Sequence, residues 1–237
     1  MICTYPKCGT TWMQNIVHLL LHNGEPFAAG CTLDDEMLFL EYDSRVSSSD
    51  LSILKTHLPL NMLSWSEQAK YIVIARNPKD CCVSFFHHTR GYVDYYDYAH
   101  GTFDDYFPRF LNGQVDFGSF FDHFASWEPR FNDPNVFFCT YEEMICDIKD
   151  IVLRLAMFLD VKLGDNLLEK VIQHSSFKSM RKDEKVFTGE SPKDTFRFIR
   201  KGEIGDWHNY FNEEQSRLID MKVKQYPLMK KLWAKYI

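Results

Sequence analysis

Short apolar runs alternate with stretches of helical spacing along most of this chain. The runs that predict strands cover residues 1–3, 52–56, 71–75 and 136–140. Between them, apolar residues recur every three or four positions and predict helices over residues 12–20, about 78–90 and about 142–159. A near-continuous apolar run such as 71–75 is typical of a strand buried on both faces. The alternation therefore predicts an α/β fold with a central parallel sheet flanked by helices.

The remaining segments are less regular. Residues 28–50 mix acidic, serine and apolar positions without a clear period, which predicts a loop or short helices over a cleft, with disorder as the alternative. Residues 91–130 carry many aromatic side chains on short helical segments, and about the last 70 residues mix helices with loops. We expect a single domain over residues 1–237, with its binding crevice at the carboxyl ends of the strands.

The segment between the first strand and the first helix, Thr4 to Trp12 (T-Y-P-K-C-G-T-T-W), has the composition of an anion-binding loop. It leads into a helix N-terminus, where unpaired N–H groups and the positive end of the dipole favour an anion. Gly9 permits close backbone approach, Thr10 and Thr11 add hydroxyl groups, and Lys7 adds a charge. The Walker A loop places its lysine directly after the last glycine, whereas Lys7 precedes Gly9 by two residues. The segment therefore predicts an anion site that differs from the usual ATP-binding loop.

Two further stretches carry cations. Arg76 follows the run 71–75, where a magnesium-dependent phosphoryl-transfer enzyme would carry an acidic metal ligand. Its guanidinium offers a fork to a phosphate group, and Ser84 adds a hydroxyl; the alternative is that Arg76 only pairs with Asp80. The segment 200–207 (R-K-G-E-I-G-D-W) joins two cations to two glycines that expose backbone N–H groups. Three cationic loops imply a ligand with more than one anionic group.

Composition narrows the class of partner. The chain has 237 residues, of which 45% are hydrophobic, and its net charge of −6 argues against nucleic-acid binding driven by a global positive field. The seven cysteines, including the neighbours Cys81 and Cys82, lack paired or zinc-site spacing and indicate reduced thiols in a cytoplasmic protein. No signal peptide or membrane-length apolar run is visible, so no membrane partner is expected. The aromatic content of 16% suits an aromatic-lined pocket or plain core packing equally.

Five motifs resemble those of the cytosolic sulfotransferases. Residues 4–12 resemble their 5′-phosphosulfate loop (T-Y-P-K-S-G-T-T-W), residues 76–84 their 3′-phosphate motif, and residues 200–211 their R-K-G-x-x-G-D-W-K-N-x-F segment. Residues 55–59 (K-T-H-L-P) and 141–144 (Y-E-E-M) also match. The motifs occur in family order and span nearly the whole chain. The resemblance implies a P-loop NTPase-like sulfotransferase fold and transfer of the sulfuryl group of 3′-phosphoadenosine-5′-phosphosulfate (PAPS), without a metal, to a hydroxyl or amine of a small acceptor.

The resemblance also implies roles for individual residues. The implied cofactor-binding residues are Lys7, Cys8, Gly9, Thr10, Thr11, Trp12, Arg76, Ser84, Tyr141, Ser175, Phe177, Arg200, Lys201 and Gly202. The implied catalytic residues are His57, Lys7, Lys55 and Ser84. Trp12 and Phe177 would sandwich the adenine, with core packing as the alternative for each. His57 would be the general base, since a histidine near its unperturbed pKa accepts a proton at neutral pH; His87 and His88 are the next candidates.

The chemistry agrees with a metal-free reaction. A sulfuryl group in transfer carries less charge than a phosphoryl group, so lysines and backbone donors can stabilise its oxygens.

This chain departs from the family pattern in several places. Cys8 replaces the usual serine of the loop, which exchanges a hydroxyl donor for a weaker, oxidisable thiol. The family's dimerisation motif, K-x-x-x-T-V-x-x-x-E, would begin at His208, but Asn212-Glu213 replaces the Thr-Val pair and Arg217 replaces the last glutamate. We therefore expect a monomer or a different dimer. The first strand is short, which suggests that the family's N-terminal segment is missing.

Three readings remain open from the sequence. The first is an active sulfotransferase, the second a truncated, inactive relative that binds only the nucleotide, and the third a P-loop small-molecule kinase. The acceptor pocket is expected to involve residues 27–50 and 88–104, and its aromatic side chains favour a phenol, catechol, aryl monoamine or steroid. The aromatic residues expected there are Phe85, Phe86, Tyr92, Tyr95 and Tyr96.

Overall fold

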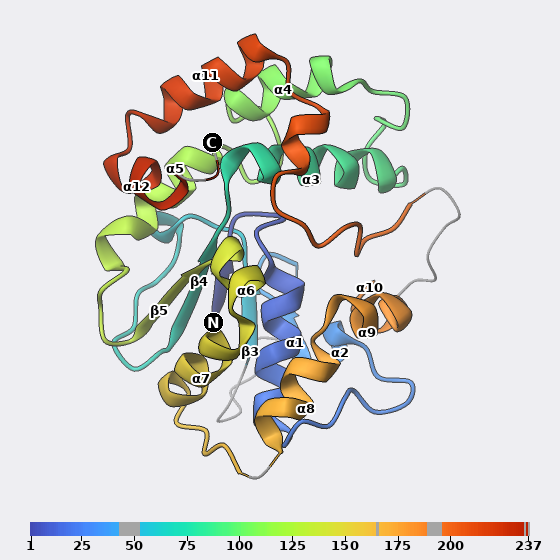
Figure 1. Ribbon diagram of the computed structural model, residues 1–237, viewed down its shortest axis with the longest axis vertical. Helices are drawn as coiled ribbons and strands as arrows, with labels where there is room; N and C mark the ends of the chain where they lie inside the picture. Colours follow the sequence, from blue (N-terminus) through green and yellow to red (C-terminus); the bar gives the residue numbers. More distant parts are fainter. Residues whose placement is uncertain (43–52, 165, 189–195, 235, 237) are drawn as a thin grey trace.

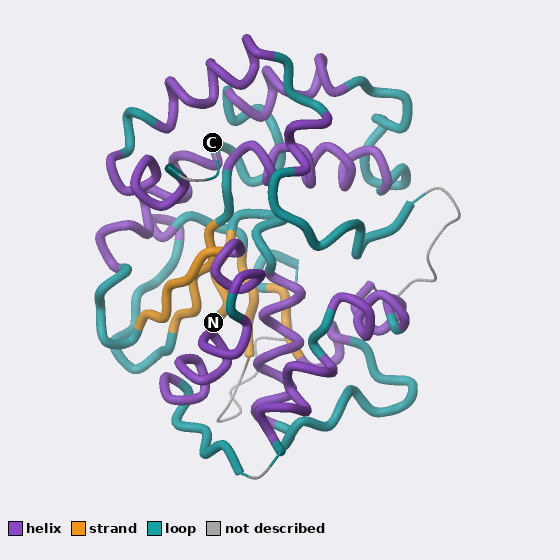
Figure 2. The backbone as a smooth tube through the Cα atoms, viewed as in Figure 1, coloured by secondary structure: helices purple, strands orange, loops and turns teal. Residues whose placement is uncertain are grey.

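A twisted parallel sheet forms the centre of the computed structural model, which describes residues 1–42, 53–164, 166–188, 196–234 and 236 (Figures 1 and 2). Within these residues the sheet has five strands in the order β2-β3-β1-β4-β5. The strands are β1 (Ile2–Thr4), β2 (Met37–Phe39), β3 (Ile53–Thr56), β4 (Tyr71–Ala75) and β5 (Val136–Thr140). All their pairings are parallel, so the predicted α/β fold is confirmed.

β1 lies in the middle of the sheet although it comes first in the chain. Ile2 is paired with Lys55 of β3 on one side and with Ile72 of β4 on the other. On one side the chain goes from β1 to the edge strand β2 and returns to β3, and on the other side it continues through β4 to β5, so β1 marks the position where the strand order reverses. In such sheets ligands bind at the carboxyl ends of the strands next to that position. The predicted anion loop follows β1 directly.

Side chains of the central strands alternate between two hydrophobic layers. On β4, Tyr71, Val73 and Ala75 face one layer and Ile72 and Ile74 face the other. The first layer packs against α3 (Pro78–Gly91), α4 (Phe103–Leu111), α5 (Phe120–Trp127), α11 (Glu213–Val223) and α12 (Pro227–Trp233). The second packs against α1 (Thr10–Leu21), α7 (Ile148–Phe158) and α8 (Leu167–His174). Helices therefore cover both faces of the sheet, as Figure 1 shows.

The predicted single helix over residues 142–159 is wrong. The chain forms α6 (Tyr141–Cys146) and α7, which are separated by Asp147. Asp147 has a non-helical backbone, with φ −148° and ψ 74°, and its carboxylate accepts a hydrogen bond of 3.0 Å from the N–H of Asp150. Aspartate competes with the helical backbone in this way and begins a new helix instead of continuing the old one.

The region predicted as a loop or short helices also contains a strand. α2 (Leu33–Glu36) agrees with the prediction, but β2 follows it and pairs with β3 at the edge of the sheet. Three residues are too few for a period-two pattern to be recognised. Residues 43–50 of the same prediction, and residue 52 of the strand predicted over 52–56, lie outside the described residues.

The remaining helices are short. They are α9 (Phe177–Lys182), α10 (Glu184–Thr188) and the 3₁₀ helices η1 (Leu60–Met62), η2 (Glu128–Arg130) and η3 (Asp206–Asn209). Asn212 caps α11 by accepting a bond of 2.8 Å from the N–H of Gln215. Asn212, which replaces the threonine of the family's Thr-Val pair, thus serves to cap a helix. That the chain makes no dimer contact through residues 208–217 stays a prediction.

Candidate active site

A cavity of about 760 Å³ lies at the carboxyl ends of the strands. Most of the residues implied by the sequence motifs line it: Lys7, Gly9, Thr10, Thr11, Trp12, Lys55, His57, Arg76, Ser84, Tyr141, Ser175, Phe177, Arg200, Lys201 and Gly202. Segments far apart in the chain thus meet at one place, because parallel strands end at the same edge of the sheet. Cys8 is the one implied residue that does not line the cavity.

The loop after β1 has the backbone of an anion site. Lys7 and Gly9 have positive φ angles of 67° and 107°, and a Cβ at Gly9 would lie 3.0 Å from the ring of Tyr141. Gly9 is also the N-cap of α1, and no side chain caps the first turn of this helix. Gly9, Thr10 and Thr11 all border the cavity, so the positive end of α1 faces it.

The ammonium form of Lys7 is disfavoured in this site. Burial, and then the nearby charge of Arg76, lower the pKa of Lys7 to about 7. Its Nζ lies 3.5 Å from Nδ1 of His88 and 4.0 Å from the ring centroid of Phe198. An anion beside Nζ would favour the ammonium form and raise this pKa again.

The side chain of Cys8 points away from the cavity. Cys8 is fully buried, and its Sγ lies 3.7 Å from Sγ of Cys81. Burial raises the pKa of this thiol. The expectation that the thiol replaces a hydroxyl donor toward the ligand is not met, because the side chain packs under the loop while the neighbouring residues face the cavity.

Arg76 is held by backbone carbonyls and not by Asp80. Its Nη1 donates to the carbonyl of Lys7 at 3.1 Å and its Nη2 to that of Glu203 at 3.3 Å, while its Nε is buried without a partner. The guanidinium also lies 4.1 Å from the ring centroid of Tyr141. Both hydrogen-bond partners are neutral carbonyls. Burial by itself would lower the pKa of Arg76, but the nearby charges of Tyr141, Asp80 and Glu142 raise it, so the guanidinium stays charged toward the cavity.

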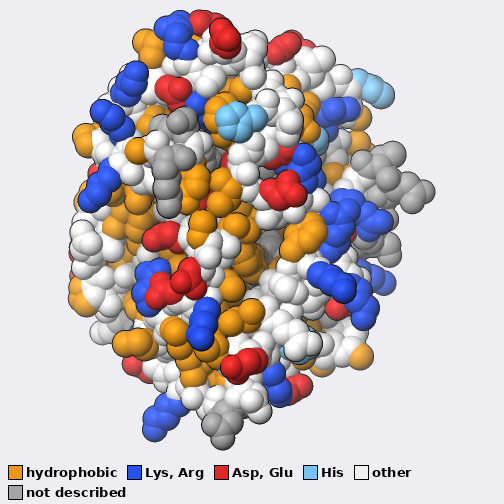
Figure 3. All heavy atoms as spheres, viewed as in Figure 1, with side chains coloured by type: hydrophobic (Ala, Val, Ile, Leu, Met, Phe, Trp, Pro, Cys, Tyr) orange, Lys and Arg blue, Asp and Glu red, His pale blue; other side chains and the backbone are white. Residues whose placement is uncertain are grey.

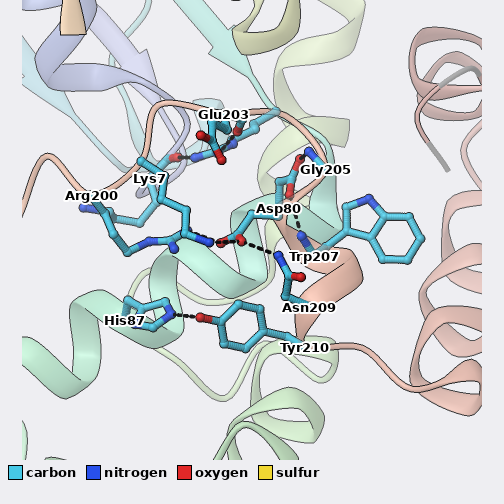
Figure 4. A network of polar contacts seen from close by, with 12 residues as sticks. Lys7, Asp80, His87, Arg200, Glu203, Gly205, Trp207, Asn209 and Tyr210 are labelled. Carbon is cyan, nitrogen blue, oxygen red and sulfur yellow. Dashed lines mark hydrogen bonds and ion pairs between the residues drawn. The ribbon is translucent and has the colours of Figure 1, made fainter. Parts of the chain in front are cut away.

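Asp80 has a different role, which Figure 4 shows. Its carboxylate accepts hydrogen bonds from the N–H of Gly205 at 2.7 Å and from the N–H of Trp207 at 3.0 Å. These bonds fix the C-terminal loop against α3. The carbonyl of Glu203, which holds Arg76, belongs to the same loop.

Arg200 and Lys201 both pair with Asp206. Arg200 Nη2 lies 2.6 Å from Asp206, and Lys201 Nζ also contacts this carboxylate. Burial by itself would raise the pKa of Asp206, but hydrogen bonds from Lys201, Asn209 and Arg200 lower it to about 2. Two cations share one anion, so the group retains a net positive charge at the cavity wall.

The aromatic residues implied for the adenine lie close to buried polar groups. Trp12 meets Tyr141 edge to face, with ring centroids 5.7 Å apart. The Phe177 ring is 40% exposed, and a Cβ at Gly202 would lie only 2.6 Å from it, so glycine allows the C-terminal loop to approach this ring. Trp12 Nε1 and Ser175 Oγ are buried and have no partner.

His57 is oriented by the end of β1. Its Nδ1 lies 2.7 Å from the carbonyl of Thr4, and a carbonyl can only accept, so Nδ1 carries the proton and Nε2 keeps the lone pair. The backbone N–H of His57 donates to Glu41 at 2.6 Å. The pKa of His57 is not near its unperturbed value, as we expected, but is lowered to about 4 by burial and then by the charges of Lys55 and Lys7. His57 is therefore neutral throughout the physiological range.

Lys55 lies beside this histidine at the end of β3. Its Nζ is 3.4 Å from Asp34 and 4.7 Å from the ring centroid of Phe39. Of the two alternative histidines, His88 lines the cavity, whereas His87 does not and is bonded to the hydroxyl of Tyr210 at 2.7 Å (Figure 4).

Aromatic rings form the wall around His57. The rings of Phe39 and Phe117 have centroids 5.3 and 5.0 Å from that of His57. Four of the five predicted aromatic residues line the cavity, namely Phe85, Tyr92, Tyr95 and Tyr96. The prediction is wrong for the fifth, Phe86, which does not line the cavity and is buried against Phe103 in the hydrophobic core.

Several lining residues were missed from the sequence. They include Gln14, Phe117, Phe198 and Glu203. None lies in a motif with a recognisable spacing except Glu203, which stands inside the segment 200–207. Phe117 has a positive φ of 63°, which an amino-acid sequence does not reveal.

Basic side chains gather on one face of the molecule although the net charge is −6 (Figure 3). In this view the group lies on the side of α9 and α10. These two helices carry Lys178, Arg181, Lys182 and Lys185. Such a local field attracts small anions without the global positive charge of a nucleic-acid-binding protein. None of the helices in the described part of the chain is long and apolar enough to cross a membrane.

Comparison with known proteins identifies one family. The model of the sulfotransferase domain matches residues 1–232. The chain is 33% identical to sulfotransferase 1C2 of Oryctolagus cuniculus over 238 residues, which cover 93% of this chain and 80% of that protein. It is also 33% identical to sulfotransferase 1B1 of Canis lupus familiaris over 246 residues, covering 95% of this chain and 82% of that protein.

Comparison with solved structures identifies proteins of the same fold. The crystal structure of mouse sulfotransferase SULT7A1 complexed with PAP superimposes with a TM-score of 0.79 at 28% identity, covering 99% of this chain and 86% of that one. Retinol dehydratase, solved with androsterone and the inactive cofactor PAP, superimposes with a TM-score of 0.82 at 24% identity and shares the fold, covering 94% and 79%. The predicted P-loop NTPase-like sulfotransferase fold is thus confirmed.

Proposed function

This chain belongs to the sulfotransferase family and is an enzyme of the PAPS-dependent sulfotransferase class. From that premise we propose that it transfers the sulfuryl group of PAPS to a hydroxyl or amine of a small aromatic acceptor. The observation that carries the proposal is a single cavity in which a neutral His57, with a free Nε2, lies between an anion-binding loop and an aromatic wall.

The residues present fit the nucleotide. Three buried donors in the cavity wall, Arg76 Nε, Ser175 Oγ and Trp12 Nε1, have no protein partner. A buried polar group without a partner costs about 1–3 kcal/mol, so these atoms favour a ligand that brings acceptors to them. A nucleotide with a 3′-phosphate and a 5′-phosphosulfate brings such groups at both ends.

Each residue on the nucleotide side then has a task. Lys7 and the N-terminus of α1 bind the 5′-phosphosulfate, and Arg76, Ser84 and the Arg200 segment bind the 3′-phosphate. Trp12 and Phe177 hold the adenine, with Tyr141 and Ser175 beside them.

Transfer needs one proton to be moved. The acceptor oxygen forms a bond to sulfur while the bond from sulfur to the bridging oxygen of the phosphosulfate breaks. Nε2 of His57 takes the acceptor's proton, and Thr4 holds the ring in the tautomer that can do so. Lys7, with Lys55 nearby, stabilises the negative charge that develops on the leaving oxygen. Lysines and backbone donors supply this stabilisation, so we expect no metal to be required.

The wall around His57 suits flat, apolar acceptors. Phe39, Phe117 and the tyrosines of residues 92–96 surround it, which favours a phenol, catechol, aryl monoamine or steroid over a sugar. Retinol dehydratase, which shares the fold, was solved with the steroid androsterone, and this supports the proposed class.

The test is product formation from PAPS. The protein is incubated with PAPS and a panel of phenol, catechol, amine and sterol acceptors, once with excess chelator and once with magnesium, and sulfated products are identified by mass spectrometry. We expect equal product with and without metal. Binding of the nucleotide without product from any acceptor would indicate an inactive relative, and phosphorylated product from ATP and magnesium would indicate a kinase.

A further inference from the structure

Away from the cavity, two histidines and a glutamate meet near the C-terminal end of α1. His18 and His22 are four residues apart, so they lie on one face of the helix, and Glu36 reaches them from α2. Nδ1 of His18 is 2.6 Å from Oε2 of Glu36. Ligand atoms of the three residues all lie within 4.8 Å of one another, and residues 1–42, 53–164, 166–188 and 196–234 contain no other such group.

The backbone orients both imidazole rings. Nε2 of His18 lies 3.1 Å from the carbonyl of Glu25, and Nδ1 of His22 lies 2.9 Å from the carbonyl of His18. Since carbonyls only accept, these two nitrogens carry protons. Nε2 of His22 is left to bind a metal ion, whereas Nδ1 of His18 can bind one only when the ion replaces the proton of its hydrogen bond with Glu36. Metal-binding histidines commonly use their second ring N–H in this way.

Packing holds the group in place and leaves one side open. The ring of His18 is stacked between those of His22 and Phe27, at centroid distances of 4.2 and 3.7 Å. His18 is only 2% exposed, whereas the side chain of Glu36 is 29% exposed and His22 is on the surface. A metal ion held by three protein groups on an open surface keeps a position for water.

We propose that His18, His22 and Glu36 form a binding site for a divalent transition metal of the zinc class. Two imidazoles and a carboxylate are ligands that zinc prefers, at about 2.0–2.2 Å. The ion takes the place of the proton that His18 and Glu36 share in the hydrogen bond between them. The ordinary alternative is that the group is only this buried pair with a second histidine stacked on it.

The site would brace a wall of the cavity. It connects α1, whose N-terminus faces the anion loop, to α2, whose Asp34 pairs with Lys55 at the cavity. Phe27, stacked on His18, also contacts Phe187, which lines the cavity. The ion would therefore act on stability, and the inference does not depend on the proposed reaction.

The test is zinc binding by full-length protein without a histidine tag. We expect calorimetry to show one tight equivalent of zinc and, at about 100-fold excess over Kd, a rise in Tm of roughly 5–10 °C. His22→Phe keeps the stacked ring and the pair of His18 with Glu36, and should lose both effects. His100→Phe, at an exposed histidine elsewhere, is the matched control and should keep them.

The absorption spectrum of bound Co²⁺ distinguishes coordination by His18, His22 and Glu36 from coordination by any of the seven cysteines. The Co²⁺ form should lack the charge-transfer absorption of a thiolate ligand. Unchanged zinc binding and Tm shift in His22→Phe, a thiolate band with Co²⁺, or no zinc binding by the wild-type protein would each overturn the proposal.

Discussion

The two sides of the cavity are built in different ways. On the nucleotide side, polar side chains stand directly after strand ends, and backbone atoms hold them: Arg76 by the carbonyls of Lys7 and Glu203, and His57, at the boundary, by that of Thr4. On the acceptor side, aromatic rings come from residues 39–42, 85–96 and 117 and touch mainly one another.

Because of this difference, we expect the nucleotide side to determine nucleotide affinity and the reaction rate, and the acceptor side to determine which acceptor is used. Backbone bonds at strand ends fix atoms to a geometry that any acceptor must meet, so changes there should affect all reactions alike. Aromatic side chains on loops can be exchanged without disturbing the sheet, so changes there should alter which acceptor is used.

The largest effect is expected at the boundary between the two sides. His57→Gln removes the proton acceptor and should lower kcat by about 10²-fold or more, because the group acts only in the transition state. The Kd for the nucleotide should stay within about threefold by calorimetry. His100→Gln, on the surface, is the control. Normal turnover by His57→Gln would make His57 structural and direct attention to His88.

Substitution of Arg76 should have the next largest effect, and this effect should be confined to nucleotide affinity. Arg76→Ala removes charge-assisted hydrogen bonds worth about 1.5–3 kcal/mol to the 3′-phosphate. Affinity for adenosine 3′,5′-bisphosphate should fall by that amount, and affinity for adenosine 5′-phosphate should change little. Arg154→Ala, at an exposed arginine on α7, serves as the control. Equal losses for both nucleotides would mean that Arg76 only supports the loop.

The pH dependence should reflect the shifted groups on the nucleotide side. Protonation of His57, whose pKa is about 4, removes the base only in acid, and deprotonation of Lys7, whose pKa is about 7, weakens the anion site as pH rises. The kcat/KM for the nucleotide should therefore be flat from about pH 5 to 7 and fall up to tenfold per pH unit above. If the pH profile instead fell below about pH 6.5 and above about pH 10.4, the unperturbed pKa values of histidine and lysine, the pKa shifts attributed here to burial would be contradicted.

The smallest effect is expected on the acceptor side. Phe117→Ala opens the wall beside His57 and should raise the KM for a phenol by roughly three- to tenfold, since part of an apolar ring contact is lost. The Kd for the nucleotide should not change. Phe86→Ala is no control, because this ring is buried in the core. Phe177→Ala is the counterpart on the other side and should weaken the nucleotide without changing the acceptor KM.

These two sides also differ in how far the sequence predicts them. Lys7, His57, Arg76 and Tyr141 follow strand ends, and because parallel strands end at one edge their meeting was predictable. Phe117 and Phe198 come from irregular segments whose path depends on tertiary packing. Cys8 shows the same limit inside a motif, since its side chain is buried beside Cys81 and its neighbours Lys7 and Gly9 have positive φ angles that the sequence does not reveal. The break at Asp147 was missed because helical periodicity continues across it.

A crystal structure of the protein with adenosine 3′,5′-bisphosphate and a phenol tests the division of the cavity most directly. We predict the 5′-phosphate within hydrogen-bond distance of Lys7 Nζ and the first N–H groups of α1, the 3′-phosphate at Arg76, and the phenol hydroxyl facing Nε2 of His57. A nucleotide bound with its phosphates away from the α1 N-terminus, or a phenol bound out of reach of His57, would contradict the account.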